Sequence, residues 1–487
     1  MLGTAIASVV GAAAMSTAII TTDQTALRAA PRDSALQQAQ LRQGEVVEIR
    51  GERQDYLQVW DHQRERGGFV RASDVRRTAL EASEAPDLLA VLRFVRDTPG
   101  SEALGIGLAA AYLKAAPVQA LQGQGGVEAF DALGTAADRL ARRASSSASL
   151  SKGAEATLSA HLDVAARYGV RFHTYEREGR MQVCYDGEAF RRVLAMNSGA
   201  EPRARAALAL TRPECLDPAL RPLEQKTGQE WRAEVLDRVD PAALPGYLMN
   251  RVQLRRAGVW SSLAYQRARL GEAAQPAAER ALAALAAVNK SELAEEDVPG
   301  YNDAAMRTNA SRWAALPAVS TSPVATTRGL GLVSAPGQPG ETCVALVDAK
   351  NDVAKPLARR CTHALVWLAS ASVNREGTAL ALAVQPMEAW RELWVFRKEA
   401  GGWVIEVLPP AATVPELGYA EFAGWVPGGL QMLVAREARG EGKYRRNYEL
   451  LRLSTLAAER QAGDPNLLGA FQRWQDAAWK HQSVSVR

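Results

Sequence analysis

The stretch from residue 18 to residue 75 decides the fold of the N-terminal region. It carries Thr25-Ala26-Leu27-Arg28-Ala29-Ala30-Pro31, Gln43-Gly44-Glu45-Val46-Val47-Glu48-Ile49, Asp55-Tyr56-Leu57-Gln58-Val59-Trp60 and Gly67-Gly68-Phe69-Val70. Apolar residues alternate with polar ones in these runs, and glycine or polar turns separate them. Such alternation is typical of short antiparallel strands. We therefore expect a small β-domain over residues 19–78.

The order of these runs resembles that of a bacterial SH3-like domain. The matching features are Leu27-x-x-x-Pro31 in an entry strand, Gly44 before the second strand, residues 56–59 as the third strand and residues 68–70 as the closing strand. The resemblance implies a small SH3-like β-barrel. It also implies a binding module of the bacterial envelope, whose ligands are often cell-wall peptides.

A ligand groove in this domain would need aromatic side chains. Tyr56, Trp60 and Phe69 are the aromatic candidates, with Asp61 and Arg71 as polar neighbours. Aromatic side chains offer a large contact area at a low cost in conformational entropy. The alternative is that two of the three aromatic residues fill the core of the barrel.

Residues 1–22 carry no charge and read as the apolar part of a secretory signal. Small residues suitable for cleavage occur at 12–14 and at 16–18, so we expect residues 1–18 to be removed on export. The mature chain would then have no membrane span and would lie in the periplasm or elsewhere in the cell envelope. The positive n-region of a signal peptide is missing, so an uncleaved anchor and a plain terminus stay open.

Four cysteines, an even number, suggest disulfides in an exported chain. The expected pairs are Cys184 with Cys215 and Cys343 with Cys361, because each pair falls within one expected domain. Buried free thiols are the alternative. The spacings exclude a C-x-x-C redox motif or zinc ribbon.

The chain of 487 residues has 47% hydrophobic and 23% charged residues, which is ordinary for a folded protein of about three domains. A net charge of +4 is small for this length and gives no support for nucleic-acid binding.

The middle of the chain, residues 86–318, is rich in alanine and reads as mostly helical. One apolar stripe recurs at spacings of four and seven residues, which is typical of a packed helix face; it consists of Leu248, Val252, Val259, Leu263 and Leu270. A β-hairpin around Gly179 is expected near residues 170–185.

Beyond residue 320 the period changes to two. Leu380, Leu382 and Val384 alternate with alanines, and two β-prone runs follow at 394–396 and 403–405. We expect an antiparallel β domain over 323–460, covered by a helix at 464–481. Its units resemble the four-stranded blades of bacterial β-propellers, but only two or three fit, so a closed propeller is not expected.

Several short motifs have a structural explanation that is simpler than catalysis. Gly105-x-Gly107-x-x-Ala110 matches a dinucleotide fingerprint but lacks the preceding strand, so packed helix glycines are expected. Ser149-x-x-Lys152 with Lys226-Thr227-Gly228 matches parts of the serine β-lactamase pattern, at a separation too short for that fold.

Cys–His hydrolases often carry SH3-like modules, so Cys184 with His161 or His173 deserves comparison with them. The residues around Cys184 do not resemble the Asp-Cys-Ser nucleophile segment of that family. No histidine pair has the spacing of a zinc peptidase.

The sequence therefore predicts a multidomain α+β protein: a small N-terminal SH3-like β-barrel, a helical middle and a C-terminal antiparallel β region with blade-like repeats. We expect a non-catalytic binding or scaffold protein without a cofactor or metal, whose partner is a cell-wall peptide or an envelope protein. Two alternatives stay open. One is a cell-wall hydrolase, or a regulator of one, with its active site in the helical middle; the other is an assembly factor of an envelope complex.

Overall fold

The computed structural model describes residues 16–146, 150–177, 179–316, 324–325, 329–350, 352–412 and 416–480. The chain forms two compact units, Met1–Ala219 and Leu220–Arg487. The boundary between them lies inside the helical region that we expected as one piece at 86–318. The helices before residue 219 belong with the N-terminal sheet, and the later helices belong with the C-terminal strands.

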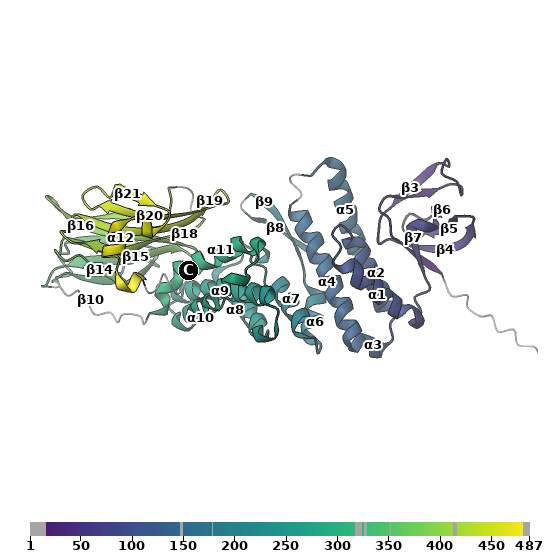
Figure 1. Cartoon of the computed structure of the whole chain (residues 1–487), viewed down its shortest axis with the longest axis horizontal. Helices are drawn as coiled ribbons and strands as arrows, with labels where there is room; N and C mark the ends of the chain where they lie inside the picture. The colour runs from purple at the N-terminus through teal and green to yellow at the C-terminus, as the bar shows by residue number, and fades with distance from the viewer. Residues whose placement is uncertain are drawn as a thin grey trace, which may run out of the picture. The chain divides into compact units, whose positions relative to one another are not determined.

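The first unit begins with an antiparallel sheet (Figure 1). Its strands are β1 (Thr17–Ile20), β2 (Thr25–Arg28), β3 (Gln37–Leu41), β4 (Val46–Arg53), β5 (Tyr56–Asp61), β6 (Arg66–Arg71) and β7 (Val75–Thr78). They are arranged in the order β3-β2-β6-β5-β4-β1-β7. One face buries a shared apolar core that includes Leu27, Leu57 and Val70. The expected small β-domain is therefore present as a sheet around one core.

The residues that the structure describes show the antiparallel sheet of the expected SH3-like barrel, but they do not form a closed barrel. The ladder is open, because the edge strands β3 and β7 do not pair with each other in the described sheet. Alternation of apolar residues reports which face of a strand is buried, whereas closure depends on strand tilt and stagger around the whole sheet.

The expected signal peptide at 1–18 overlaps this sheet. Residues 1–15 lie outside the described part of the chain, and so does the candidate cleavage site at 12–14. The second candidate site, at 16–18, lies on β1, where Ala18 is fully buried between β4 and β7. Cleavage after residue 14 keeps β1 whole, whereas cleavage after Ala18 removes half of it.

Helices pack on the sheet and against each other in the same unit. They are α1 (Ala85–Arg96), α2 (Glu102–Ala115), α3 (Val118–Gln122), α4 (Gln124–Ser145), α5 (Lys152–Arg167), α6 (Glu188–Ala195) and α7 (Ala200–Leu210). Ile19 of β1 points away from the sheet core and packs into the cluster formed by α1, α2 and α4. Strand β1 thus contributes to two cores at once, with alternate side chains facing each.

The hairpin expected near Gly179 is formed by β8 (Phe172–Arg177) and β9 (Arg180–Tyr185). Gly179 has φ +71°, the left-handed conformation that glycine adopts readily in tight turns. Cys184 of β9 is bonded to Cys215, the pairing favoured from the sequence.

The second unit starts with α8 (Pro222–Asp237), α9 (Gly246–Arg269), α10 (Gln275–Ala286) and α11 (Val298–Ser311). The apolar stripe lies on α9, and four of its five members are buried: Leu248, Val252, Val259 and Leu263. Leu270 is 46% exposed because it follows the last residue of the helix.

The C-terminal strands are β10 (Val324–Ala325), β11 (Gly331–Pro336), β12 (Thr342–Val347), β13 (Ala358–Thr362), β14 (Leu365–Val373), β15 (Ala379–Met387), β16 (Trp390–Glu399), β17 (Gly402–Leu408), β18 (Leu417–Val426), β19 (Gln431–Gly440), β20 (Lys443–Arg452) and β21 (Ala458–Ala462). Strands β10–β13, β14–β17 and β18–β21 are successive antiparallel meanders. The region is not wholly antiparallel as expected: β16 and β18 are joined by a short parallel pairing.

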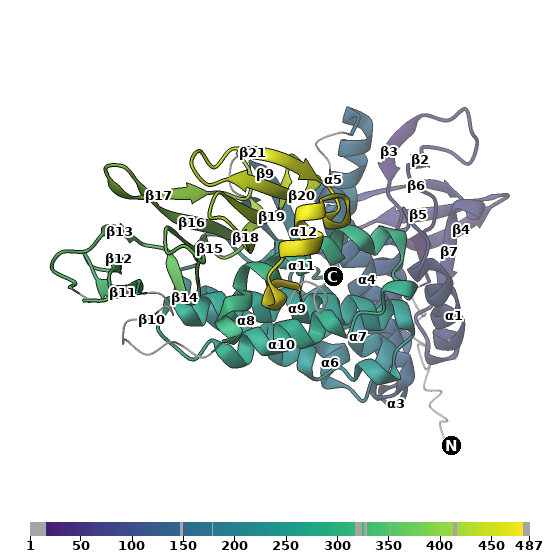
Figure 2. The ribbon, with the colours of Figure 1, turned by 60° about the vertical axis from the view of Figure 1, so that its left-hand side comes forward.

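The meanders pack face to face. Leu332 and Leu346 of the first meander share one apolar core with Leu382 of the second, and a further core joins the second to the third. The other face of β18–β20 is covered at one end by α11 and at the other by α12 (Gly469–Trp474), as Figures 1 and 2 show. The helix expected at 464–481 is interrupted at Gln475, and its final residue lies outside the described part.

Candidate functional site

The candidate groove residues lie on β5 and β6, and their register decides which of them can act together. Tyr56 pairs with Arg71, and Trp60 pairs with Gly67. Because side chains alternate along a strand, Tyr56, Trp60, Phe69 and Arg71 share the face opposite the core. In the described part of the sheet, the core cluster contains none of the three aromatic residues. Tyr56 is nevertheless buried, at 6% exposure, whereas Trp60 and Phe69 are partly exposed. The structure thus brings four of the five candidates to one outer face.

Asp61 has the opposite orientation. It points to the same face of β5 as Leu57 and Val59, and it is only 2% exposed. Its carboxylate accepts hydrogen bonds from the backbone N–H of Gln63 and from Arg64 Nη1, at 3.0 and 2.7 Å. Asp61 therefore holds the turn between β5 and β6 together and does not face a ligand.

Asp33, which no sequence motif indicated, completes the face. It lies in the loop between β2 and β3, close after Pro31. The hydroxyl of Tyr56 donates to Asp33 Oδ1 at 2.5 Å, and Arg71 Nε donates to the same oxygen at 3.0 Å. Arg71 also contacts Asp33 through Nη2. Only its position after a proline in a polar loop could have pointed to it, because its partners are distant in sequence.

The titration of this group follows from its contacts. The Arg71 guanidinium, and then the Tyr56 hydroxyl, lower the pKa of Asp33. The same hydrogen bond to Asp33 raises the pKa of Tyr56. At neutral pH the face therefore presents an ionised carboxylate, a protonated phenol and a guanidinium that also lies over the Tyr56 ring, 5.8 Å from its centroid.

Trp60 and Phe69 extend the face toward β4 and β2. The guanidinium of Arg50 lies 4.6 Å from the centroid of the Trp60 ring. Phe69 is opposite Arg28 of β2. Both aromatic side chains are partly exposed. The outer face thus combines aromatic surface with guanidinium groups, a combination that suits amide and carboxylate groups of peptides.

The disulfides bear on the hydrolase alternative. A disulfide sulfur is not the thiolate that cysteine nucleophiles require, so Cys184 bonded to Cys215 cannot attack a substrate in this state. Its candidate partner His161 is 2% exposed and lies elsewhere, with Nε2 3.1 Å from Asp23 Oδ1. His173 is directly opposite Cys184 on β8, where it is exposed.

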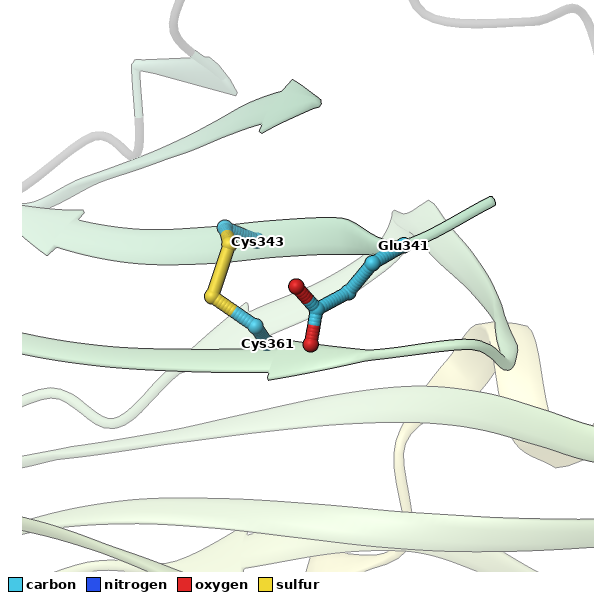
Figure 3. Close-up of side chains that lie close together, drawn as sticks. All are labelled: Glu341, Cys343 and Cys361. Atoms are coloured by element: carbon cyan, nitrogen blue, oxygen red, sulfur yellow. A yellow bond between two sulfur atoms is a disulfide. The ribbon is translucent and has the colours of Figure 1, made fainter. Parts of the chain in front are cut away.

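The second disulfide joins Cys343 and Cys361, which are directly opposite on β12 and β13. Figure 3 shows the carboxylate of Glu341 beside it, and the potential ligand atoms of the three residues lie within 4.8 Å of one another. Two sulfurs bonded to each other do not provide thiolate ligands, so the group in this state is a disulfide beside one carboxylate.

The remaining motifs are parts of helices. Gly105 and Gly107 lie inside α2, and a Cβ atom at Gly107 would be 2.8 Å from the backbone oxygen of Gly44. Gly107 therefore permits close packing of α2 on the loop before β4, whereas a Cβ atom at Gly105 would make only ordinary contacts with Ala136 and Val95. Lys226, Thr227 and Gly228 lie inside α8, whereas Ser149 lies outside the described residues.

The length and composition of the helices bear on whether one of them could cross a membrane. Among the described residues, no helix is both long and apolar enough to cross a bilayer.

No protein-family model and no curated protein matches this chain.

Proposed function

We propose that this chain is a non-catalytic binding or scaffold protein of the bacterial cell envelope. Its N-terminal domain, over residues 19–78, is proposed to be SH3-like and to bind a cell-wall peptide or a protein partner. The observation that carries the proposal is the outer face of β5 and β6, where Tyr56, Trp60, Phe69 and Arg71 stand together beside Asp33.

The chemistry of that face supports peptide recognition. The Tyr56 ring is held by Asp33 and flanked by Arg71, so its orientation is set before a ligand arrives. A preorganised aromatic group loses little entropy on binding. Trp60 supplies further ring surface beneath the guanidinium of Arg50, which also pairs with Glu48 at 3.4 Å.

The C-terminal region supports the scaffold part of the proposal. Three successive meanders stacked face to face are the arrangement expected of blade-like repeats. Such stacked sheets form a rigid body whose outer edges and covering helices offer a second interaction surface.

The proposed envelope location rests on the two disulfides. Disulfides persist in oxidising compartments such as the periplasm and are rare in the cytosol. A chain with both Cys184–Cys215 and Cys343–Cys361 bonded fits an exported protein.

The test is co-sedimentation of the purified full chain with intact peptidoglycan, with soluble fragments assayed in the same tube. We expect binding without release of fragments. Trp60→Ala and Arg71→Ala should each weaken binding at least about tenfold, as hot-spot residues do. Phe94→Ala is the matched control, because Phe94 is 77% exposed on α1 of the same unit.

Release of fragments would contradict the non-catalytic assignment. Loss of binding in Phe94→Ala, or full binding in both groove variants, would contradict the assignment of the face. Absence of any binding by the unaltered chain would reject the cell-wall ligand and leave a protein partner to be sought.

A further inference from the structure

The second unit contains a pocket of about 410 Å³ between α11 and the strands β19 and β20. Figures 1 and 2 show α11 beside these strands. Its lining residues are Lys290, Tyr301, Asn302, Ala305, Met306, Glu437, Tyr444, Arg445 and Arg446. We propose that this pocket binds the carboxylate of a small ligand, such as the C-terminus of a short peptide. The proposal is independent of the function assigned to the N-terminal sheet.

The size and walls of the pocket suit a small organic ligand. Pockets for small molecules usually occupy roughly 300–1,000 Å³ and combine apolar walls with a few polar groups. Here Ala305 and Met306 of α11 are apolar and buried, at 7% and 4% exposure. Tyr301 and Tyr444 add aromatic surface from the helix and from β20. The apolar part accepts the small side chain or methyl group next to a carboxylate.

Glu437, an acidic residue of the pocket lining, already has partners within the protein. Glu437 is 5% exposed; one of its oxygens accepts from the hydroxyl of Tyr419 at 2.8 Å, and the other contacts Arg446 Nε. Nearby Asp303 is likewise bound, to Arg439 at 2.6 Å and to the hydroxyl of Tyr444 at 2.7 Å. Both carboxylates are therefore neutralised by cations of the protein itself.

Two cationic side chains of the lining, Arg446 and Lys290, can still donate hydrogen bonds to a ligand. Arg446 uses Nε for Glu437, and its two Nη atoms make no hydrogen bond to another residue that the structure describes. Lys290 lies with Nζ 5.5 Å from the centroid of the Tyr301 ring and has no carboxylate partner within the described residues. An anchored guanidinium and a free ammonium at one pocket form a site for a carboxylate, which accepts from both.

The alternation of side chains along β19 and β20 decides which residues face α11. Glu437 is opposite Arg446, and Arg439 is opposite Tyr444, so these four side chains share the face that α11 covers. Arg445 lies between Tyr444 and Arg446, and alternation turns its side chain to the other face. Arg445 also lines the pocket, but we assign the contact with the carboxylate to Arg446, whose side chain is on the face that α11 covers.

The test uses the full chain and a blocked dipeptide, N-acetyl-alanyl-alanine, titrated by calorimetry at low ionic strength. The free-acid form should bind saturably, and the C-terminal amide form should bind at least about tenfold more weakly, because a hydrogen bond to a charged group is lost. Acetate as competitor distinguishes the sources of the carboxylate. Competition at concentrations similar to the dipeptide indicates a free small acid, whereas weak competition indicates a peptide C-terminus.

Substitutions inside and outside the pocket test where the dipeptide binds. Lys290→Gln and Arg446→Lys should each weaken the binding about tenfold. Arg446→Lys keeps a cation beside Glu437, and thermal unfolding checks that the unit remains folded. Asn302→Phe fills the pocket from a partly exposed position and should abolish binding. Lys398→Gln, at an exposed lysine outside the pocket, is the matched control and should bind normally.

Three results would overturn the proposal: no binding of the free acid, equal binding of acid and amide, or unchanged binding in Asn302→Phe. Trp60→Ala should leave this binding intact, so failure here is distinguishable from failure of the function proposed for the first unit.

Discussion

The phenol oxygen of Tyr56 lies 2.5 Å from Oδ1 of Asp33, which precedes it by 23 residues. This contact ties the loop between β2 and β3 to strand β5. It also turns the Tyr56 ring, which is 6% exposed, into a fixed part of the outer face.

Tyr56→Phe keeps the ring and removes the hydrogen bond. We expect the free energy that holds the loop between β2 and β3 against β5 to fall by roughly 1 kcal/mol. Hydrogen exchange followed by mass spectrometry should show faster exchange in residues 29–36 and unchanged exchange in α4. Equal exchange of the loop in both proteins would mean that the hydrogen bond does not hold it.

Asp33 should titrate below the usual range of aspartate, because Arg71 and then Tyr56 stabilise its charged form. Because the pKa of Asp33 is lower in the folded than in the unfolded state, its charged form stabilises the fold at pH values above the unfolded pKa. That contribution is lost as the pH falls through the folded pKa. An NMR titration of Arg71→Gln should show the pKa of Asp33 moving upward.

The control for this titration is Arg66→Gln on the same strand. Arg66 donates to the backbone oxygen of Gln38, and it pairs with no carboxylate among the residues that the structure describes. Its removal should leave the titration of Asp33 unchanged, and an equal shift in both variants would indicate a general charge effect.

Tyr168 links α5 to the sheet, with its hydroxyl donating to the backbone oxygen of Gly44 at 2.5 Å. Burial, followed by the charge of Glu45, raises the pKa of Tyr168 to about 12. The folded unit therefore holds this proton at pH values where the unfolded chain has lost it. Stability is complete below the unfolded pKa of about 10 and falls as the pH rises toward 12.

Tyr168→Phe should lower the stability at neutral pH by roughly 1 kcal/mol and flatten its decline above pH 10. The measurement is hydrogen exchange of the peptide containing α5 at several alkaline pH values. A decline as steep as that of the unaltered chain would show that Tyr168 does not cause it.

Gly107→Ala should destabilise the first unit by roughly 1–3 kcal/mol, because its Cβ would meet the backbone of Gly44. Gly153 is the matched control: it lies in α5, and a Cβ there meets nothing within 4 Å. Gly153→Ala should be neutral or stabilising by up to about 1 kcal/mol. Urea unfolding of both variants tests the pair, and equal effects would contradict close packing at Gly107.

Removal of the Cys184–Cys215 disulfide by a double serine substitution should cost roughly 3–4 kcal/mol, since it opens a loop between residues 31 apart. The loss should be local to the first unit. Limited proteolysis should cut the hairpin β8–β9 faster, while the second unit keeps its resistance. Faster cleavage in the second unit alone would contradict this.

Much of the local structure was predictable. Alternation identified β5 and β6, and Gly179 indicated the hairpin, because both depend on neighbours within a few residues. The stripe on α9 identified four buried positions for the same reason. The break at Gln475 was not predictable, because it depends on a bond from the backbone N–H of Asp476 to the oxygen of Ala423.

The candidate site was predictable only in part. The sequence pointed to Tyr56, Trp60, Phe69 and Arg71 because aromatic and charged residues alternate with apolar ones on adjoining strands. Asp61 was expected as a polar neighbour of the aromatic residues, but the alternation of side chains along β5 turns it inward. Asp33 could not be found, since its role depends on partners 23 and 38 residues away.

By itself, the sequence determined the kinds of local element and the face that each strand or helix buries, because those follow from spacing along the chain. Tertiary structure alone decided that the N-terminal sheet stays open, that the helical region divides between two units, and that α11 and β20 enclose a pocket. These features depend on contacts between residues far apart in the chain. The free energy of such contacts depends on the packing of whole elements, which the local pattern does not specify.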